Sequence, residues 1–546
     1  MFDMKKKVFA LLLCGLPMMM NAQYTFDALH MSQTELRGTA RFQSMAGAFG
    51  ALGGDLSTLT QNPAGIGVYR NSDLGITFGM DFLSTKAGVD KSTNSKFNVN
   101  NIGYVGAIRL DSESVPNLNF GFTYNRLKDY KRHYVGGVAN IPTSMSNYIA
   151  DAFVNMRQVN ANDLMWDDDY DPYFDQPWPA WSAVTTFDMP TTTDGYVGII
   201  NANGDYMQGL YGPGTTGAAY YEVDERGHAD EYNIAFGGNF SNKLYFGLDF
   251  GITDLDYRSH MYYDEELNNA YVMADDYDLL ESPITNVDTR AEWGMYNYKH
   301  TEGTGVNFKL GLIWKPVQAL RIGAAFHTPT YYDMRDTYYV GADFKAYQNG
   351  AQLYSASKGS NNGYDNSGTY TIKTPWHFLG SVAGVIGTNG IISVDYECVS
   401  NETLRIGDDR GNDYADVTDD AKVYLKPTNI IRIGGEYRVN PNWSLRAGYS
   451  IKDSQVESAV DKYEIGISTS DTNPAYQYDN KVQNVTCGVG YRYKTFYTDL
   501  AYVHTIRNSV YNAFSPINDE YGYEPNVSAD VTDHNNRISL TLGVRF

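Results

Sequence analysis

The chain is poor in cysteine and, after its leader, has no long hydrophobic run. Three cysteines occur in 546 residues, and only Cys398 and Cys487 lie outside the amino-terminal leader. Two cysteines make no disulfide framework, and their spacing matches no metal site. Beyond residue 22 no apolar stretch reaches the roughly 18 residues of a transmembrane helix. These absences exclude a disulfide-rich secreted domain and a helical membrane protein.

The leader itself has the layout of a secretory signal peptide. A basic cluster at residues 5–7 precedes an apolar run over residues 8–20, and Ala22 offers a cleavage point. The run is too short to span a bilayer as a helix. Cys14 follows a bulky leucine where a lipoprotein signal has a small residue, so a lipid anchor is not favoured. We expect residues 1–22 to be removed on export.

Basic residues are also scarce. The 42 Lys and Arg residues against 64 Asp and Glu residues give a formal net charge of −22. Nucleic-acid binding needs a basic surface, so this class of function is excluded. An exported chain without a transmembrane helix is either a soluble secreted protein or an outer-membrane β-barrel. The 46 tyrosines suit a barrel, whose membrane interfaces carry aromatic girdles.

The carboxy-terminal segment NRISLTLGVRF alternates strictly between apolar and polar side chains. Period-two alternation indicates a strand with one apolar and one polar face. A last strand that stops at a carboxy-terminal Phe546 resembles the signal that outer-membrane barrels present to the barrel-assembly machinery. We therefore expect that machinery to be a partner of this chain.

The same alternation recurs along the chain in fourteen segments, an even number typical of bacterial outer-membrane barrels. Segments of about ten residues fit a tilted transmembrane strand. The prediction is an all-β, 14-stranded antiparallel transmembrane barrel in the outer membrane of a Gram-negative bacterium. The segments are 72–82, 100–110, 117–126, 231–240, 243–257, 304–315, 318–327, 372–386, 390–398, 428–439, 442–452, 482–494, 496–506 and 534–546.

The links between these segments alternate in length, as periplasmic turns and extracellular loops do. Short links contain turn residues, as at 241–242, 316–317, 387–389 and 440–441. A soluble β-sandwich has no reason to sort its loops in this way. The expected long loops are 83–99, 127–230, 258–303, 328–371, 399–427, 453–481 and 507–533.

Within the predicted strands, the cations lie at only one of the two sets of alternate positions, or parities, and therefore on one face. A cation facing lipid costs roughly 2–4 kcal/mol at the bilayer midplane, so this parity is assigned to the lumen. The opposite parity carries large apolar side chains such as Phe236, Leu248 and Trp314. The lumen cations are Arg109, Lys309, Arg321, Lys373, Arg432, Arg446, Arg492 and Arg545.

Residues 23–71 precede the first strand and are predicted to form a plug, or hatch, inside the barrel formed by residues 72–546. A fourteen-strand barrel is too wide for its side chains to fill. The alternative is a flexible tail, but a tail is usually charged and low in apolar residues. A nucleotide loop is not favoured, because no strand precedes the glycines and no lysine follows them. Apolar residues recur at three- and four-residue steps, as in a short packed helix: Phe42, Met45, Phe49, Leu52, Leu56 and Leu59.

The sequence GTARFQSMAGAFGALGGDLSTLTQNPAGIG (38–67) resembles the amino-terminal hatch of the FadL-type family of outer-membrane transporters. The matching hatch motif is Asn62, Pro63, Ala64 and Gly65, preceded by Asp55. Later segments agree: KPVQALRIGAAFHTP (315–329), KTPWHFLGSVAGV (373–385) and IRIGGEYRVNPNWSLRAGYS (431–450). The resemblance covers nearly the whole mature chain.

This resemblance implies passive transport of long-chain fatty acids or other hydrophobic small molecules, without a cofactor and without enzymatic activity. In that family an extracellular groove captures the substrate, and hatch movement with a kink in the third strand releases it laterally. Segment 117–126 has no proline, which leaves the lateral opening unsupported here. The alternatives are a general diffusion porin and a passive channel for haem or another hydrophobic cofactor. The expected surroundings are outer-membrane lipid and lipopolysaccharide, and the expected state is a monomer.

Two sets of residues are candidates for substrate binding. Aromatic residues of the longest loop would line a capture groove, or are incidental to a solvated loop. Lumen cations would bind a fatty-acid carboxylate, or pair with lumen carboxylates such as Asp249 and Glu436. The acidic run of residues 167–171 lacks the glycine and glutamate of a calcium loop, so no metal site is predicted. The candidates are Trp166, Phe174, Trp178 and Trp181 for the groove and Lys309, Arg321, Arg432 and Arg446 for the carboxylate.

Overall fold

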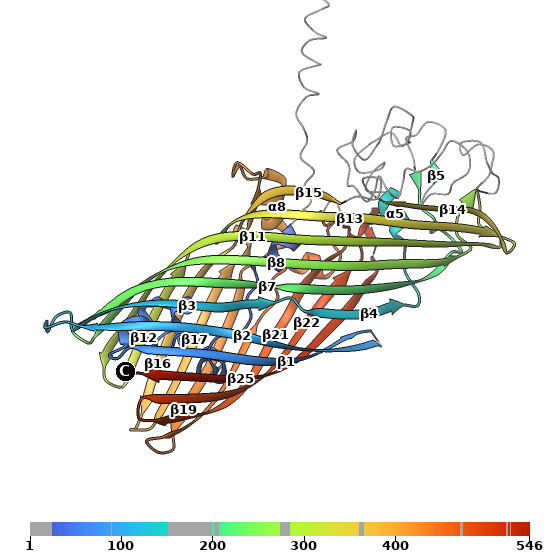
Figure 1. Ribbon diagram of the computed structural model, residues 1–546. Helices are drawn as coiled ribbons and strands as arrows, with labels where there is room; N and C mark the ends of the chain where they lie inside the picture. The colour runs from blue at the N-terminus through green and yellow to red at the C-terminus, as the bar shows by residue number, and fades with distance from the viewer. Residues whose placement is uncertain are drawn as a thin grey trace, which may run out of the picture.

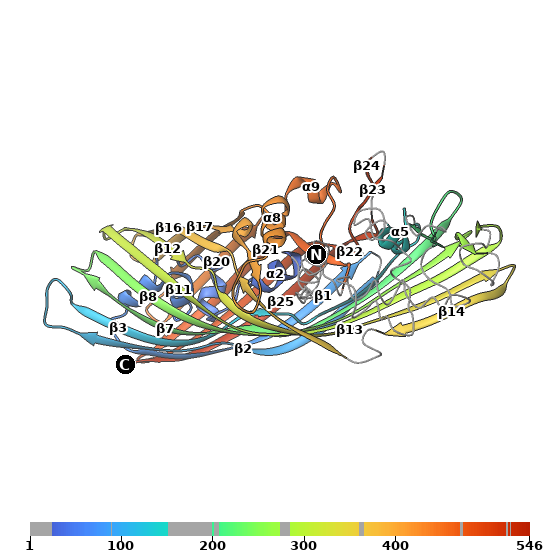
Figure 2. The ribbon, with the colours of Figure 1, turned by 90° about the horizontal axis from the view of Figure 1, so that it is seen from above.

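The computed structural model describes residues 25–88, 90–150, 199–200, 207–273, 284–359, 365–469, 473–519, 522–524 and 526–546. Strands from the whole length of this chain form an antiparallel barrel. The barrel is closed by fifteen paired positions between β1 (Asp73–Ala87) and β25 (Ser528–Arg545), the first and last wall strands. Figures 1 and 2 show the closed wall and the amino-terminal segment inside it.

Fourteen strands make the wall, as the sequence predicts, and four of them are composites of two collinear pieces. The composites are β3 with β4 (Asn117–Asp129, Arg132–Val138), β12 with β13 (Leu320–His327, Tyr331–Gln348), β15 with β16 (Asn366–Lys373, Trp376–Ile386) and β17 with β18 (Gly390–Ser400, Arg405–Gly407). The uninterrupted strands are β1, β2 (Asp90–Arg109), β7 (Thr216–Phe240), β8 (Leu244–Asn268), β11 (Thr289–Val317), β19 (Thr428–Arg438), β20 (Trp443–Lys452), β21 (Tyr476–Tyr493), β22 (Phe496–Asn512) and β25.

Smaller elements lie between the wall strands. The long connections carry a hairpin strand, β14 (Ala351–Gly359), which pairs with the outer half of β13. Short strand pairs are β5 with β6 (Ile199–Ile200, Met207–Gln208), β9 with β10 (Val272–Met273, Ile284–Thr285) and β23 with β24 (Ile517–Asp519, Gly522–Glu524). Helical segments outside the hatch are α5 (Met145–Ala150), η5 (Asn401–Thr403), α8 (Ala415–Tyr424) and α9 (Ser458–Asp461).

Every predicted strand segment coincides with a wall strand, but the predicted long loops are partly wrong. β8 has 25 residues and β11 has 29, so most of the predicted loop 258–303 is wall. Likewise β7 begins at Thr216, inside the predicted loop 127–230. Apolar alternation stops where the lipid stops, whereas backbone pairing continues as polar strands above it. Figure 1 shows this extension on the side of β7, β8, β11 and β13.

The wall has an apolar outer face and a polar inner face. On β8, four successive outward side chains are apolar and exposed, ending at Ile252, and on β11 the matching series ends at Val306. The lipid parity predicted for Phe236, Leu248 and Trp314 is therefore confirmed, because each is about half exposed on the outer face. Cys398 and Cys487 are both free. Among the described helices, none has the length and apolar character needed to cross a membrane.

The hatch lies in the lumen, and its apolar residues are buried there. It comprises α2 (Thr25–Ser32), α3 (Ala40–Ser44), α4 (Thr58–Gln61) and η1 (Pro63–Val68). The expectation of one packed helix is wrong, because the chain turns repeatedly at glycines with positive φ, among them Gly47, Gly53 and Gly54. Met45, Phe49 and Leu59 are nevertheless fully buried.

Candidate functional site

Asn62 organises the hatch motif. Its Oδ1 accepts a hydrogen bond from the backbone N–H of Ala64 at 3.1 Å and so caps η1. Its Nδ2 donates to the carbonyl of Gly50 at 2.6 Å, which joins the two glycine-rich halves of the hatch. Pro63 follows at the first helical position, where a missing N–H is tolerated. The motif thus makes a compact turn against the wall.

The hatch motif packs backbone to backbone against glycines of β8 and β11. A Cβ atom at Gly247 would overlap the carbonyl of Pro63, and one at Gly311 would overlap the Asn62 side chain. Met45 packs in the same way against Gly434 of β19 and Gly448 of β20, where an added Cβ would overlap it. Because any side chain at these positions would displace the hatch, the inward glycines of the wall form its docking surface.

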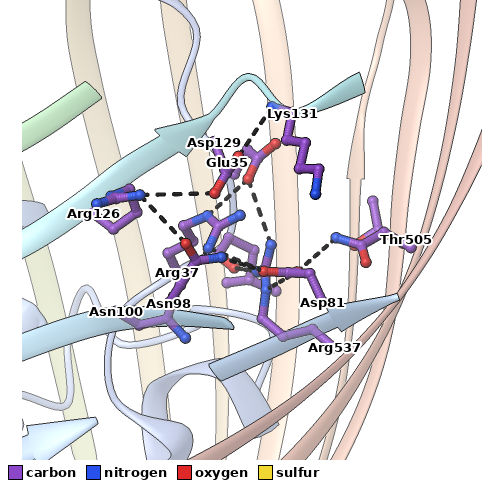
Figure 3. A network of polar contacts seen from close by, with 12 residues as sticks. Glu35, Arg37, Asp81, Asn98, Asn100, Arg126, Asp129, Lys131, Thr505 and Arg537 are labelled. Carbon is purple, nitrogen blue, oxygen red and sulfur yellow. Dashed lines mark hydrogen bonds and ion pairs between the residues drawn. The ribbon is translucent and has the colours of Figure 1, made fainter. Parts of the chain in front are cut away.

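A network of charged residues ties the hatch to the barrel seam, where β25 meets β1. On the hatch, Glu35 accepts from Arg37 Nε at 2.8 Å, Arg507 Nη2 at 3.0 Å and Arg537 Nη2 at 3.4 Å. On β1, Asp81 accepts from Arg537 Nε at 2.6 Å and from Arg37 Nη1 at 3.4 Å. Figure 3 shows Glu35 and Arg37 of the hatch converging with Asp81 of β1 and Arg537 of β25.

Burial alone would raise the pKa of Glu35, since a carboxylate loses hydration inside the lumen. The guanidinium groups of Arg37, Arg507 and Arg537 outweigh burial and lower the pKa of Glu35 from 4.5 to about 2. Glu35 therefore carries its charge at neutral pH and holds the hatch through charge-assisted hydrogen bonds.

A cavity of about 270 Å³ lies between the hatch and the wall. Its lining holds more cations than anions, in a chain whose net charge is −22. The lining cations are Arg37, Lys96, Arg126, Lys128, Lys131, Arg132, Lys309, Arg432, Lys452, Arg507 and Arg537. The lining carboxylates are Glu35, Asp81, Asp129, Glu225, Glu231, Glu397, Asp479 and Asp533. The surplus of positive charge makes this cavity suited to an anionic group.

Two cations on one wall patch of this cavity have unused donors. Arg432 Nη2 donates to Glu397 Oε2 at 2.6 Å, but its buried Nη1 has no hydrogen-bond partner among the described residues. The side chain of Lys452 also lines the cavity and makes neither a hydrogen bond nor an ion pair with any residue that the structure describes. Arg432 pairs with Ser450 and Ile430 with Lys452 across β19 and β20, so the two cations are diagonal neighbours on the lumen face.

The four predicted lumen cations have different surroundings. Lys309 and Arg432 line the cavity, and Lys309 is held by Glu231 at 2.6 Å and by Asp249 at 3.4 Å. Arg446 is fixed outside the cavity lining by Glu436 and Asp499, at 2.6 Å and 2.5 Å.

Arg321 also lies outside the cavity lining, and its Nη1 donates to the carbonyl of Leu52 in the hatch at 2.6 Å. The structure therefore brings two of the four cations together at one cavity. The groove candidates Trp166, Phe174, Trp178 and Trp181, like the acidic run of residues 167–171, lie outside the described residues.

Sequence reasoning missed Lys452, although a signal for it was present. Lys452 shares its parity with Arg446 on the same strand, and that parity was assigned to the lumen. It stands at the predicted end of the segment, where strand and loop are hard to separate. Lys128 was missed for a different reason, because a register shift between Arg126 and Lys128 turns its side chain inward.

The third strand shows no break where the resemblance places a kink. β3 is paired with β2 from Asn117 to Asn125 and with β7 from Asn117 to Arg126, both without a register shift. The irregularity falls further out, between Arg126 and Lys128, and the strand is interrupted before Arg132. The wall beside the hatch motif is therefore continuous at this strand.

The closed fourteen-strand wall, its apolar outer face and its lumenal hatch define a hatch-containing β-barrel of the outer membrane. Comparisons with known proteins agree. Residues 260–493 match the family described as outer membrane protein transport protein (OMPP1/FadL/TodX). The matched segment, which runs from β8 to the end of β21, is therefore similar to the FadL-type family of outer-membrane transport proteins.

Several solved structures match the chain at low sequence identity. A FadL homologue of Pseudomonas aeruginosa is 12% identical with a TM-score of 0.50, and the match covers 94% of this chain and 99% of that chain. The toluene transporter TodX of Pseudomonas putida is 11% identical with a TM-score of 0.46, covering 94% of this chain and 100% of that chain. The toluene transporter TbuX of Ralstonia pickettii is 13% identical with a TM-score of 0.45, covering 94% and 99% respectively. No curated protein sequence matches the chain.

Proposed function

We propose that this protein passively transports amphiphilic compounds that have an anionic head and an apolar tail, long-chain fatty acids above all. The observation that carries the proposal is the pair of unused donors on Arg432 and Lys452, facing a cavity with a surplus of positive charge. A carboxylate placed between them would accept charge-assisted hydrogen bonds, which are roughly twice as strong as neutral ones.

The tail would contact the apolar part of the same lining. Each methylene transferred from water to an apolar surface contributes about 0.8 kcal/mol, so a chain of several methylenes is retained without an energy source. Because the cavity also touches Leu36 and Phe42 of the hatch, the bound tail would lie against the hatch itself. The aliphatic and phenylalanine residues of this lining are Met31, Leu36, Phe42, Leu83, Leu127, Ala229, Ile430 and Val482.

Release would require the hatch to move, because it separates the cavity from the periplasmic end of the lumen. The hatch contacts that would have to break are the Glu35 network and the docking of the motif on Gly247 and Gly311. A lateral opening belongs to the same proposal, although the continuous pairing of β3 gives it no support at Asn117–Asn125. The filled lumen favours this function over a general diffusion porin, which needs an open bore.

The remaining partners belong to the same proposal. Insertion by the barrel-assembly machinery would read the last strand, whose terminal Phe546 is hydrogen-bonded through its N–H to Ser72 at 3.0 Å and has an exposed ring. The apolar outer face would contact outer-membrane lipid and lipopolysaccharide, and the barrel, whose first and last wall strands pair with each other, would act as a monomer.

The test compares a fatty acid with its methyl ester. Purified protein in detergent is titrated with both ligands for wild type, Lys452→Met, Arg432→Met and the control Lys315→Met, whose side chain lies at a periplasmic turn. Loss of a hydrogen bond to a charged group costs about 1.5–3 kcal/mol, so binding of the acid should weaken at least about tenfold in the two cavity variants. Binding of the ester should change little. Equal losses for acid and ester, or no loss for either, would refute recognition of an anionic head at this patch.

A further inference from the structure

Three potential metal ligands meet on the outer face of the wall, above the apolar band. Asp256 lies on β8, and His300 and Glu302 lie on the neighbouring strand β11. Register places Glu302 directly opposite Asp256 and His300 one step further out on the same face. The residues are 44 or more positions apart in sequence across the two strands, so no spacing motif signals the cluster.

The donor atoms lie at distances that one cation can bridge. His300 Nε2 is 3.3 Å from Asp256 Oδ2 and 4.0 Å from Glu302 Oε1, and all three donor atoms lie within 4.8 Å of one another. Two atoms bound to a tetrahedral zinc ion at about 2.0–2.1 Å lie roughly 3.3 Å apart. The observed separations therefore need only small side-chain rotations to meet at a common centre.

We propose that Asp256, His300 and Glu302 form a binding site for a divalent transition-metal ion, with Zn²⁺ as the ion that fits best. An imidazole with two carboxylates suits zinc, whereas magnesium and calcium prefer sites built only from oxygen. Three protein ligands leave a fourth position for water. This site is separate from the lumen cavity and does not depend on the proposed transport function.

Its level along the wall makes the site accessible from the extracellular side. The last apolar pair on these strands is Ile252 with Val306, and Asp256 with Glu302 comes two pairs further out. At about 3.4 Å per residue, four residues along a tilted strand place the site roughly 10 Å above the apolar band. Glu302 is well exposed and the other two ligands are partly so, so a hydrated ion reaches them without crossing the barrel.

Arg258 is the group that opposes metal binding. Its Nη2 donates to Asp256 Oδ2 at 3.2 Å, the same oxygen that faces His300. Its guanidinium therefore occupies a ligand lone pair and repels a cation. Metal binding would displace Arg258 and join β8 to β11 by coordination in addition to their backbone hydrogen bonds.

The test is titration of the purified full-length protein in detergent with Zn²⁺ by calorimetry, with the absorption spectrum of Co²⁺ as a second probe. The protein is isolated with a tag that contains no histidine. We expect one equivalent to bind, and His300→Ala or Glu302→Gln to weaken that binding at least about tenfold. Because Arg258 competes with the ion, Arg258→Gln should strengthen binding several-fold.

The matched control is His260→Ala. His260 lies on the same outer face of β8, and its Nδ1 contacts the hydroxyl of Tyr296 at 2.9 Å instead of the cluster. Zn²⁺ binding should be unchanged in this variant. Absence of stoichiometric binding, equal loss in His260→Ala and His300→Ala, or an unchanged affinity in Glu302→Gln would each overturn the proposal.

Discussion

Arg507 of the wall donates to Glu35 of the hatch at 3.0 Å, across 472 residues of sequence. The contact is one of three between Glu35 and guanidinium groups, and Arg537, which makes another, also donates through Nη1 to the carbonyl of Leu36 at 2.6 Å. The hatch is thus held at the seam by charge and at β8 and β11 by close backbone packing. These two attachments respond to different perturbations.

Acid should release the charged attachment. The folded-state pKa of Glu35 is about 2, below its ordinary value of 4.5, so the stabilisation is complete above about pH 5 and is lost as the pH falls toward 2. A shift of this size corresponds to roughly 3 kcal/mol. We expect hatch residues to become accessible to protease, and the conductance in planar bilayers to rise, over that range. In Glu35→Gln the conductance at pH 7 should already be higher and should depend less on acid; a wild-type acid response retained in full would contradict this role.

Bulk at the docking glycines should displace the hatch without harming the barrel. Gly247→Ala places a methyl group against the Pro63 carbonyl, and overpacking of this kind typically costs 1–3 kcal/mol. We expect the variant to assemble as a heat-modifiable barrel whose conductance exceeds that of the wild type. Gly380→Ala is the control, because no atom lies within 4 Å of its added Cβ.

Asn62→Ala should loosen the hatch motif locally. The substitution removes the cap on Ala64 and the bond to the Gly50 carbonyl, and the lost cap alone costs about 1 kcal/mol. Hydrogen exchange of residues 44–68 should accelerate while that of the wall strands stays unchanged. Asn62→Asp keeps the acceptor and loses the donor, so protection near Gly50 should fall more than protection at Ala64.

Deleting residues 23–65 should leave a barrel that assembles but conducts without gating. The wall is closed by its own strand pairing, and the deletion removes no wall strand. Small solutes should then leak through liposomes that contain the variant. Failure of the variant to reach a folded, heat-modifiable state would show instead that the hatch is needed to form the wall.

Much of the wall was predictable because its two faces meet different solvents. Alternation at Ile538, Leu540 and Leu542 marks β25 directly, and cations such as Lys309 and Arg446 reveal the inner parity. The extent of β8 and β11 was not predictable, because above the lipid both faces are wet and the apolar signal disappears. Strand length there is set by pairing with neighbours distant in sequence.

The candidate site was predictable only in part. Parity identifies Arg432 as a lumen residue, but it cannot show that Arg446 is neutralised by Asp499 from a distant strand while Lys452 has no such partner within the described chain. The outer cluster of Asp256 and His300 depends in the same way on the register between β8 and β11. Both sites arise from contacts across strands, which spacing along one strand does not encode.

The strands of unequal length give the barrel an oblique upper rim. β8 and β11 have 25 and 29 residues, whereas the uninterrupted strands β19 and β20 have eleven and ten, and Figure 1 shows the long strands projecting on one side of the barrel. A molecule diffusing along the cell surface therefore meets a tall barrel wall when it approaches from the side of β8 and β11, and a low wall when it approaches from the opposite side. The orientation of the protein about the membrane normal therefore decides which neighbouring molecules contact the tall side of the wall.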